Sequence, residues 1–213
     1  MMIEALFLAS ALSQQDLPLD AIYRGGTDLK ADGAVTCNYS FIPGARRPTN
    51  VEVSCSAGEE SEAVTARARE VLNWEAPRRL NRREIGEPVR GTLVLRENNE
   101  DPDRPQWLVD VTQVMASEAR YPDSQAREGH QAACMVTFHV VDLQADVQDV
   151  RCETQGFEAA FRRAARQAVE RYVFIGDGNA YCWTTVVDFT PISFLVMERP
   201  TPPECVPPEG LGK

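Results

Sequence analysis

The sequence has few of the residues and motifs on which catalysis usually depends. It contains two histidines, no H-E-x-x-H, no Walker-type glycine loop, no G-x-S-x-G, and no G-x-G-x-x-G after an expected strand. We place His130 in a turn and predict that His139 lies on the surface of a strand, on the face opposite Phe138. We therefore expect no enzyme, no cofactor and no small-molecule substrate.

Clustered positive charge is also scarce. The chain carries 22 Lys and Arg against 32 Asp and Glu, a net charge of −10. A nucleic-acid partner needs clustered basic residues that neutralise phosphates, so we expect no such partner. One local basic run consists of Arg78, Arg79, Arg82 and Arg83, and we interpret it as a solvated loop after a helix.

The sequence lacks an apolar run of the roughly 20 residues that a membrane span requires. The run Ala5 to Ser13 is too short for a span but has the length of a signal-peptide core. We predict a signal peptide at residues 1–13, although Glu4 and the absence of positive charge make its start atypical. The alternative is an apolar N-terminus of a cytosolic protein.

The clearest periodic patterns lie between residues 121 and 189. Apolar and mixed residues alternate from Ala133 to Val140, the pattern of a half-buried strand, and a second strand follows near residue 150. A helix is predicted next, because apolar residues recur at i, i+3, i+4, i+7 and i+8. After Gly176–Asn179 breaks the chain, Tyr181 to Phe189 returns to strand residues. The predicted order is β-β-α-β, and the helical stripe is Phe157, Ala160, Phe161, Ala164, Ala165, Ala168, Val169 and Tyr172.

The first half of the chain repeats this order. Two strands flank a turn containing Pro43, Gly44 and Pro48, a helix follows, and a last strand runs from Val89 to Leu95. The cysteines of each hairpin are 18 residues apart in both halves (55 − 37 = 18; 152 − 134 = 18). The aligned pairs are Cys37 with Cys134, Tyr39 with Val136, Phe41 with Phe138, Val53 with Val150, Cys55 with Cys152, Val71 with Val169, and Trp74 with Tyr172.

These residues resemble the C-terminal domain of TonB-type energy transducers. That domain typically has a Y-P start, a V-x-V-x-F strand, a V-x-x-V-x-V strand and a helix F-D-x-A-A-L-x-A-V-R-x-W-R-F. Arg162, Arg166 and Tyr172 depart from the acidic residue, leucine and tryptophan of that helix, and no Asp-Gly marks the second hairpin. The matching positions are Tyr121, Pro122, Phe138, Phe161, Ala164, Ala165, Val169, Tyr172 and Phe174 in the second copy, and Trp74, Gly86 and Pro88 in the first.

The resemblance implies an α+β fold with two TonB C-terminal-like domains in tandem. Each would be a β-β-α-β unit whose amphipathic helix packs on a small antiparallel or mixed sheet. We expect the first copy at residues 14–96, an acidic linker at 97–106, the second copy at 107–199 and a proline-rich tail at 200–213. Residues 107–120 would lead into the second copy.

Six cysteines in an exported chain predict disulfides. The two hairpins, centred near residues 46 and 143, place Cys37 opposite Cys55 and Cys134 opposite Cys152, within bridging distance. Elimination then pairs Cys182 with Cys205. The repeated C-x17-C spacing lacks the short C-x2–4-C of zinc sites, so we expect no metal site.

Members of the resembled family lie in the periplasm and pair the edge of their last strand with the TonB box, a short peptide of an outer-membrane transporter. The resemblance thus implies binding by strand addition. We expect the first edge to be the more open one, because a bridge from Cys182 would tie the tail near the second. The candidate edge residues are Val89, Thr92, Leu93, Val94 and Leu95 in the first copy, and Thr184, Thr185, Val186 and Val187 in the second.

Three hypotheses follow for the function. The first is an exported periplasmic module that binds a peptide or protein in TonB-dependent outer-membrane transport, because the chain shows neither a membrane helix nor a long proline-rich spacer. The second is a membrane-anchored energy transducer whose anchor lies in residues 2–15 or upstream of Met1. The third is an envelope protein without enzymatic activity whose copies dock on each other and form a homodimer.

Overall fold

The structure is a computed structural model, and it describes residues 32–44, 46–56, 61–73, 86–99, 103–189 and 205–206. The predicted signal peptide, Trp74 and the basic run at 78–83 lie outside these residues. In chain order the elements are β1 (Asp32–Ile42), β2 (Thr49–Cys55), α1 (Ser61–Leu72), β3 (Val89–Glu97), β4 (Trp107–Val109), β5 (Thr112–Met115), α2 (Asp123–Glu128), β6 (Ala132–Val141), β7 (Gln144–Thr154), α3 (Glu158–Val169), β8 (Val173–Ile175) and β9 (Ala180–Phe189).

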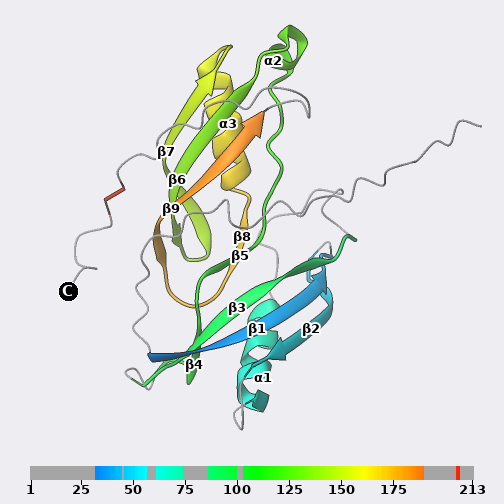
Figure 1. The fold of residues 1–213 in the computed structure, drawn as a ribbon, viewed down its shortest axis with the longest axis vertical. Helices are drawn as coiled ribbons and strands as arrows, with labels where there is room; N and C mark the ends of the chain where they lie inside the picture. The colour runs from blue at the N-terminus through cyan, green and yellow to red at the C-terminus, as the bar shows by residue number, and fades with distance from the viewer. Residues whose placement is uncertain are drawn as a thin grey trace, which may run out of the picture.

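The predicted α+β class is confirmed, and both halves of the chain have the expected element order. The hairpin β1–β2, helix α1 and strand β3 correspond to the hairpin β6–β7, helix α3 and strand β9. The two main sheets have the orders β2-β1-β3-β4 and β7-β6-β9, and all of their pairs are antiparallel. In each sheet the first strand of the hairpin therefore lies between two other strands, and one helix packs beside each sheet (Figure 1).

Both long helices bury one apolar stripe against their sheet. In α3, Phe161 and Ala165 are fully buried in the second core, whereas Arg162 is exposed. In α1, Val64 and Leu72 are fully buried in the first core. The i, i+4 spacing of these residues places them on one face of a helix. Burial of side chains of this size contributes about 1.5–3 kcal/mol each, so each helix is held by its apolar stripe.

The second hairpin turns without glycine. Its two turn residues, Asp142 and Leu143, have φ angles of 51° and 58°. Positive φ at both positions is the type I′ geometry, whose twist matches the strands on either side. Leu143 also packs partly against the second core. An Asp-Gly sequence is therefore not needed for this turn.

The predicted linker at 97–106 is instead the connection between two paired strands. Glu97 is the last residue of β3 and pairs with Trp107 of β4. The Asn98 N–H donates to the Gln106 carbonyl at 2.7 Å and closes this connection. Residues 107–109 thus extend the first sheet rather than leading into the second copy. Residues 107–109 join the first sheet because this placement buries Trp107 and Val109 in the first core.

Helix α3 ends at Val169, earlier than the apolar stripe predicts, and a short strand follows it. This strand, β8, pairs antiparallel with β5. Val173 and Ile175 belong to the first core, whereas Phe174 belongs to the second. Successive residues of a strand point to opposite sides, so the β5–β8 ribbon is a wall shared by both cores (Figure 1).

Strand β6 is buried on both faces, which corrects two predictions. All residues from Ala132 to Val140 are buried, although their alternation predicts a half-buried strand. His139 is 7% exposed, so it is not a surface residue. The alternation identifies the face that meets α3, but it does not determine whether the opposite face is covered. A short helix that the sequence did not predict, α2, precedes β6 and ends before Gly129, whose φ is 70°.

Candidate peptide-binding edges

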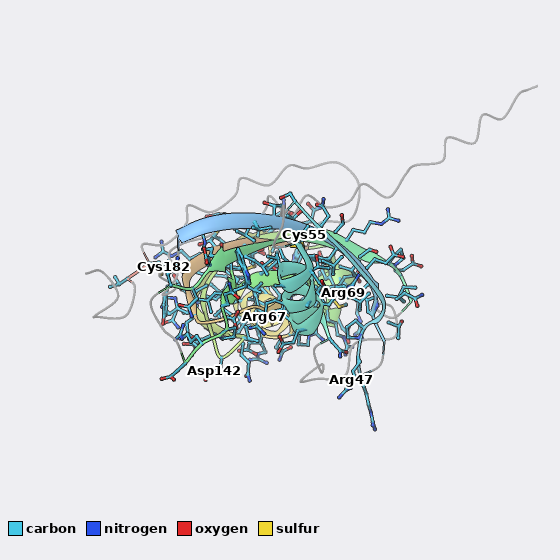
Figure 2. All side chains as sticks on the ribbon, turned by 90° about the horizontal axis from the view of Figure 1, so that it is seen from below. Arg47, Cys55, Arg67, Arg69, Asp142 and Cys182 are labelled. Atoms are coloured by element: carbon cyan, nitrogen blue, oxygen red, sulfur yellow. A yellow bond between two sulfur atoms is a disulfide. The ribbon has the colours of Figure 1, made fainter. Side chains whose placement is uncertain are left out.

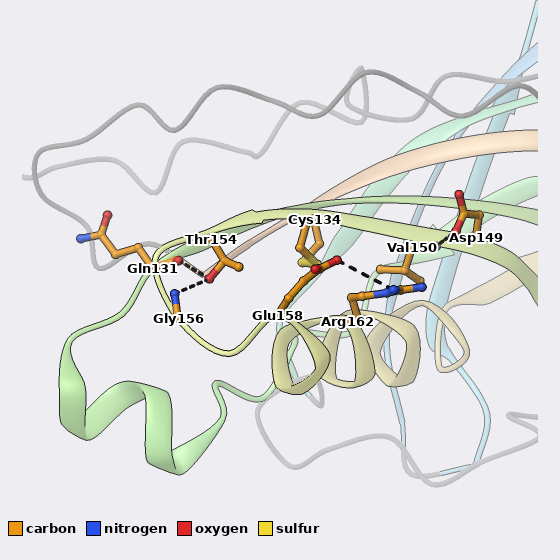
Figure 3. Close-up of a disulfide and its surroundings, with 9 residues drawn as sticks. Gln131, Cys134, Asp149, Val150, Thr154, Gly156, Glu158 and Arg162 are labelled. Carbon is orange, nitrogen blue, oxygen red and sulfur yellow. Dashed lines mark hydrogen bonds and ion pairs between the residues drawn. A yellow bond between two sulfur atoms is a disulfide. The ribbon is translucent and has the colours of Figure 1, made fainter.

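Two disulfides lock the hairpins in the predicted pairing. Cys37 lies opposite Cys55 and Cys134 opposite Cys152, and each pair is bonded, with Cα–Cα distances of 3.9 and 4.0 Å. The typical distance in this register is about 4.5 Å, so the strands approach closely at the bridges. Figure 3 shows Cys134 above the first turns of α3, where Glu158 and its partner Arg162 lie. Each bridge links the two strands of its hairpin.

The third disulfide ties the tail to the start of β9. Cys182 is bonded to Cys205 with a Cα–Cα distance of 5.4 Å, as elimination predicts. Cys182 lies at an irregular position between β6 and β9 and has a φ of 60°. Figure 2 shows Cys182 and its bridge at the margin of the molecule. The tail is therefore held near one end of β9.

The backbone pattern of β9 identifies the groups that point away from its sheet. Cys134 of β6 lies opposite Val187. The Gln131 carbonyl accepts the Gln155 N–H from the β7 side at 3.2 Å, so by alternation Cys134 directs its backbone groups to β9. Val187 therefore bonds to β6. The residues whose backbone groups point outward are its alternate neighbours, Thr184, Val186 and Asp188.

Among the described residues β9 has only one partner strand, whereas β3 has two. β4 pairs with β3 from Leu95 to Glu97. The Asp110 N–H also donates to the Val94 carbonyl at 2.9 Å. By the same alternation, Arg90 and Thr92 are left with outward backbone groups. The first edge is thus shorter than the second, contrary to our expectation that it is the more open one, because β4 occupies it.

The side chains at the predicted edge positions mostly serve the cores. Leu93 and Leu95 are fully buried, and Val89 packs against the same core. Val187 belongs to the second core, and the Thr184 hydroxyl lies 3.4 Å from the Thr137 hydroxyl. Thr185 is buried, Val94 and Val186 are half-buried and Thr92 is exposed. The edges can therefore offer a partner mainly backbone groups.

The aromatic positions of the resembled motif join the helix to the sheet. Tyr121 packs edge-on against Phe161 and Phe189, with ring-centre distances of 5.8 and 5.7 Å. Its hydroxyl donates to the His130 carbonyl. Burial raises the pKa of Tyr121. Pro122 comes directly before α2. These residues stabilise the second core and offer no chemistry at the surface.

A second aromatic group contains Phe138, Phe174 and Trp183. Phe174 lies 6.0 Å from Phe138 and 5.6 Å from Trp183, measured between ring centres. Tyr172 packs beside Phe174 at 6.5 Å. Burial raises the pKa of Tyr172, and its hydrogen bond with Thr185 opposes that shift. The remaining motif positions in the second copy, Ala164, Ala165 and Val169, pack in or against the second core. In the first copy, the Gly86 N–H donates to the Pro43 carbonyl, and Pro88 is exposed.

An ion pair that the sequence does not predict joins the two halves. Arg67 of α1 donates through Nη2 to the Asp177 carboxylate at 2.6 Å. Asp177 also accepts the Val109 N–H at 2.8 Å, and its own N–H donates to the Val109 carbonyl at 2.8 Å. Figure 2 shows Arg67 and the exposed Arg69 on opposite sides of α1. We call Arg67, Asp177 and Val109 the interlobe clasp.

Local features of both partners support the clasp. Burial alone would lower the pKa of Arg67, but hydrogen bonds and charges of Glu70 and Asp177 outweigh it, so the pKa is raised. Gly176 has a φ of 127°, and a Cβ there would lie 2.9 Å from backbone atoms of residues 109–111. Only glycine fits this approach. The only sequence feature that points to this contact is Gly-Asp-Gly at residues 176–178, and on its own it indicates no more than a break between helix and strand.

The comparisons with known proteins find no match: no family model, no curated protein and no solved structure is similar to this chain. The described helices include none that is both long and apolar enough to cross a membrane.

Proposed function

We propose that this chain is an exported, periplasmic protein that binds an extended peptide by strand addition at the outer edge of β9. The main support for the proposal is that the backbone groups of Thr184, Val186 and Asp188 point away from the sheet. Among the described residues, β9 pairs with only one strand. The resemblance to TonB C-terminal domains supplies the class of peptide, the TonB box of an outer-membrane transporter.

The cysteines support export. All six are paired in three disulfides. Disulfides form and persist in oxidising compartments such as the periplasm, where thiol-reducing systems do not dominate. The apolar run near the N-terminus is the proposed export signal.

The geometry favours β9 over β3 as the binding edge. Thr184, Val186 and Asp188 offer three N–H and three carbonyl groups, whereas Arg90 and Thr92 offer two of each. Each main-chain hydrogen bond contributes about 0.5–1.5 kcal/mol, and immobilising the peptide offsets much of the total. The main chain alone therefore leaves about 4 kcal/mol or less, which corresponds to a dissociation constant of roughly millimolar size. Selectivity would come from the side chains beside the edge.

A pair of proline variants tests the proposal. Val186→Pro removes one outward N–H of β9 without removing a bond to β6, and proline is tolerated on sheet edges in this orientation. Thr92→Pro makes the same change on the β3 edge and is the matched control. Both proteins and the wild type are titrated with a TonB-box peptide while amide chemical shifts are recorded.

We expect the wild type to show shifts at the amides of Thr184, Val186 and Asp188, and Val186→Pro to bind roughly 10-fold more weakly. Thr92→Pro should bind like the wild type. Shifts at Arg90 and Thr92 instead would move the site to the first edge. If no amide shifts occur and the protein sediments as a dimer through β9, the edge serves self-association and the peptide proposal fails.

A further inference from the structure

A group of metal-ligating side chains lies outside the proposed peptide edge, beside the third disulfide. His139 comes from β6, Cys182 from β9 and Cys205 from the tail. One ligand atom of each residue lies within 4.8 Å of the other two. His139 is buried, and both cysteines are half-buried. The three residues thus place one imidazole nitrogen and two sulfurs around a common point.

A β-bulge aims these groups at one another. Phe138 pairs with Trp183 and Val140 pairs with Ala180, so two residues of β9 oppose His139 alone. Cys182 is one of the two, and its φ of 60° is unusual for a residue with a side chain. Its N–H donates to His139 Nδ1 at 3.1 Å instead of to a strand carbonyl. Bulges and strained residues of this kind are common at functional sites.

We propose that His139, Cys182 and Cys205 form a two-state site, a disulfide when oxidised and a Zn²⁺ site when reduced. A small dithiol supplies two electrons and two protons, which cleave the Cys182–Cys205 bond into two thiols while the dithiol becomes a disulfide. Zn²⁺ then binds both sulfurs as thiolates, the two thiol protons are released to solvent, and a neutral imidazole nitrogen is the third ligand.

Exposure selects this disulfide over the other two. Cys37 and Cys134 are 0% exposed, so each hairpin bridge has one sulfur-bearing residue sealed in a core. Their partners Cys55 and Cys152 are half-buried, whereas in the third bridge Cys182 and Cys205 are both half-buried, so a dithiol can approach either of its sulfurs. A dithiol must reach a sulfur in order to attack it, and exposed bridges are the labile ones. The third bridge is therefore the first to open.

The ligand geometry is compatible with Zn²⁺. Zinc–sulfur bonds of about 2.3 Å and zinc–nitrogen bonds of about 2.0 Å place tetrahedral ligands roughly 3.5–3.8 Å apart. The three ligand atoms lie within 4.8 Å of one another, but the two sulfurs are bonded to each other, at the distance of about 2 Å that disulfides share. Opening the bridge must therefore move the sulfurs apart by roughly 1.7 Å to reach the zinc geometry. In the oxidised state His139 Nδ1 accepts the Cys182 N–H, so its lone pair becomes available to Zn²⁺ only when this hydrogen bond breaks as the bridge opens. Three protein ligands leave a fourth position for water or another donor.

The test begins with reduction of the full-length folded protein by a mild dithiol. One portion is alkylated, and its intact mass and peptide map identify the freed thiols. The remainder is exchanged into metal-free buffer and titrated with Co²⁺, whose visible absorption reports tetrahedral thiolate ligation, and with Zn²⁺ by calorimetry. His139→Gln keeps a hydrogen-bond acceptor near Cys182, and His130→Gln is the matched control because it removes the other histidine.

We expect alkylation of Cys182 and Cys205 alone, and one tightly bound Zn²⁺ per reduced wild-type chain. Because even loss of a residue that supports a ligand weakens zinc binding roughly 10- to 100-fold, His139→Gln should bind at least about 10-fold more weakly, and His130→Gln should bind like the wild type. Absence of Zn²⁺ binding would overturn the proposal, as would equal affinity of His139→Gln. Prior opening of a hairpin bridge would also overturn it.

Discussion

Replacing Asp177 by alanine should destabilise the whole chain, because the interlobe clasp connects both halves. The substitution removes a 2.6 Å ion pair with Arg67 and a 2.8 Å hydrogen bond from the Val109 N–H. Hydrogen bonds to charged groups contribute about 1.5–3 kcal/mol each, and a buried donor without an acceptor costs about 1–3 kcal/mol. Val109 is 0% exposed, and the Arg67 side chain is 14% exposed.

The expected loss is smaller than the sum of these terms. Arg67 keeps its pair with Glu70 at 2.7 Å, although the Glu70 side chain is 70% exposed and stabilises it weakly. We therefore expect Asp177→Ala to lower the free energy of unfolding by about 3–4 kcal/mol. Asp177→Asn retains one oxygen acceptor and should lose roughly half as much.

Equilibrium unfolding in urea, with the disulfides intact and tryptophan fluorescence as the signal, measures these losses. The control is Arg162→Gln, which breaks a 3.8 Å pair with Glu158 whose side chains are both about half exposed. Such a pair contributes at most about 0.5 kcal/mol. If Asp177→Ala costs no more than Arg162→Gln, the clasp is not a stabilising contact and our reasoning is refuted.

Two further predictions concern stability. Replacing Cys134 and Cys152 together by alanine removes a cross-link between residues 18 apart. We expect the free energy of unfolding, measured in urea, to fall by about 3 kcal/mol. An unchanged unfolding midpoint would contradict this prediction. Burial raises the pKa of Tyr172 above the ordinary value of 10.0, with the Thr185 hydrogen bond opposing the shift. The contribution of the Tyr172 hydroxyl to the free energy of unfolding is thus fully present below about pH 10, and it is lost as pH rises through the pKa of the folded state. Unfolding free energies above pH 10 should fall less steeply in Tyr172→Phe; equal slopes would refute this.

Local periodicity explains most of what the sequence predicted. The apolar stripe of α3 and the alternation in β6 each depend on residues close in the chain, and so does the hairpin register that pairs Cys37 with Cys55. These signals located the two β-β-α-β units and the disulfides. The β9 edge was also among the predicted edges, because its strand pattern and the turn before it are local.

The features that the sequence did not predict depend on distant contacts or on coverage. β4 and β8 have three residues each, too few to establish a period. Their assignment depends on pairing with β3 and β5. The burial of His139 depends on what covers the outer face of β6, and the clasp joins residues 110 positions apart. Neither leaves a periodic pattern.

The ribbon of β5 and β8 has a consequence for the order in which the chain folds. The first core includes Val173 and Ile175, so it is completed by residues that follow β6, β7 and α3 of the second unit in the chain. A repeat made of two similar units therefore does not fold as two successive domains. If the chain is exported as we propose, the N-terminal hairpin has only its local cross-link until residues 173–175 have emerged. Long sequence separations of this kind slow folding. Cutting the chain between the units would separate the first core from the six residues between 107 and 175 that complete it, whereas every residue of the second core would stay in one fragment.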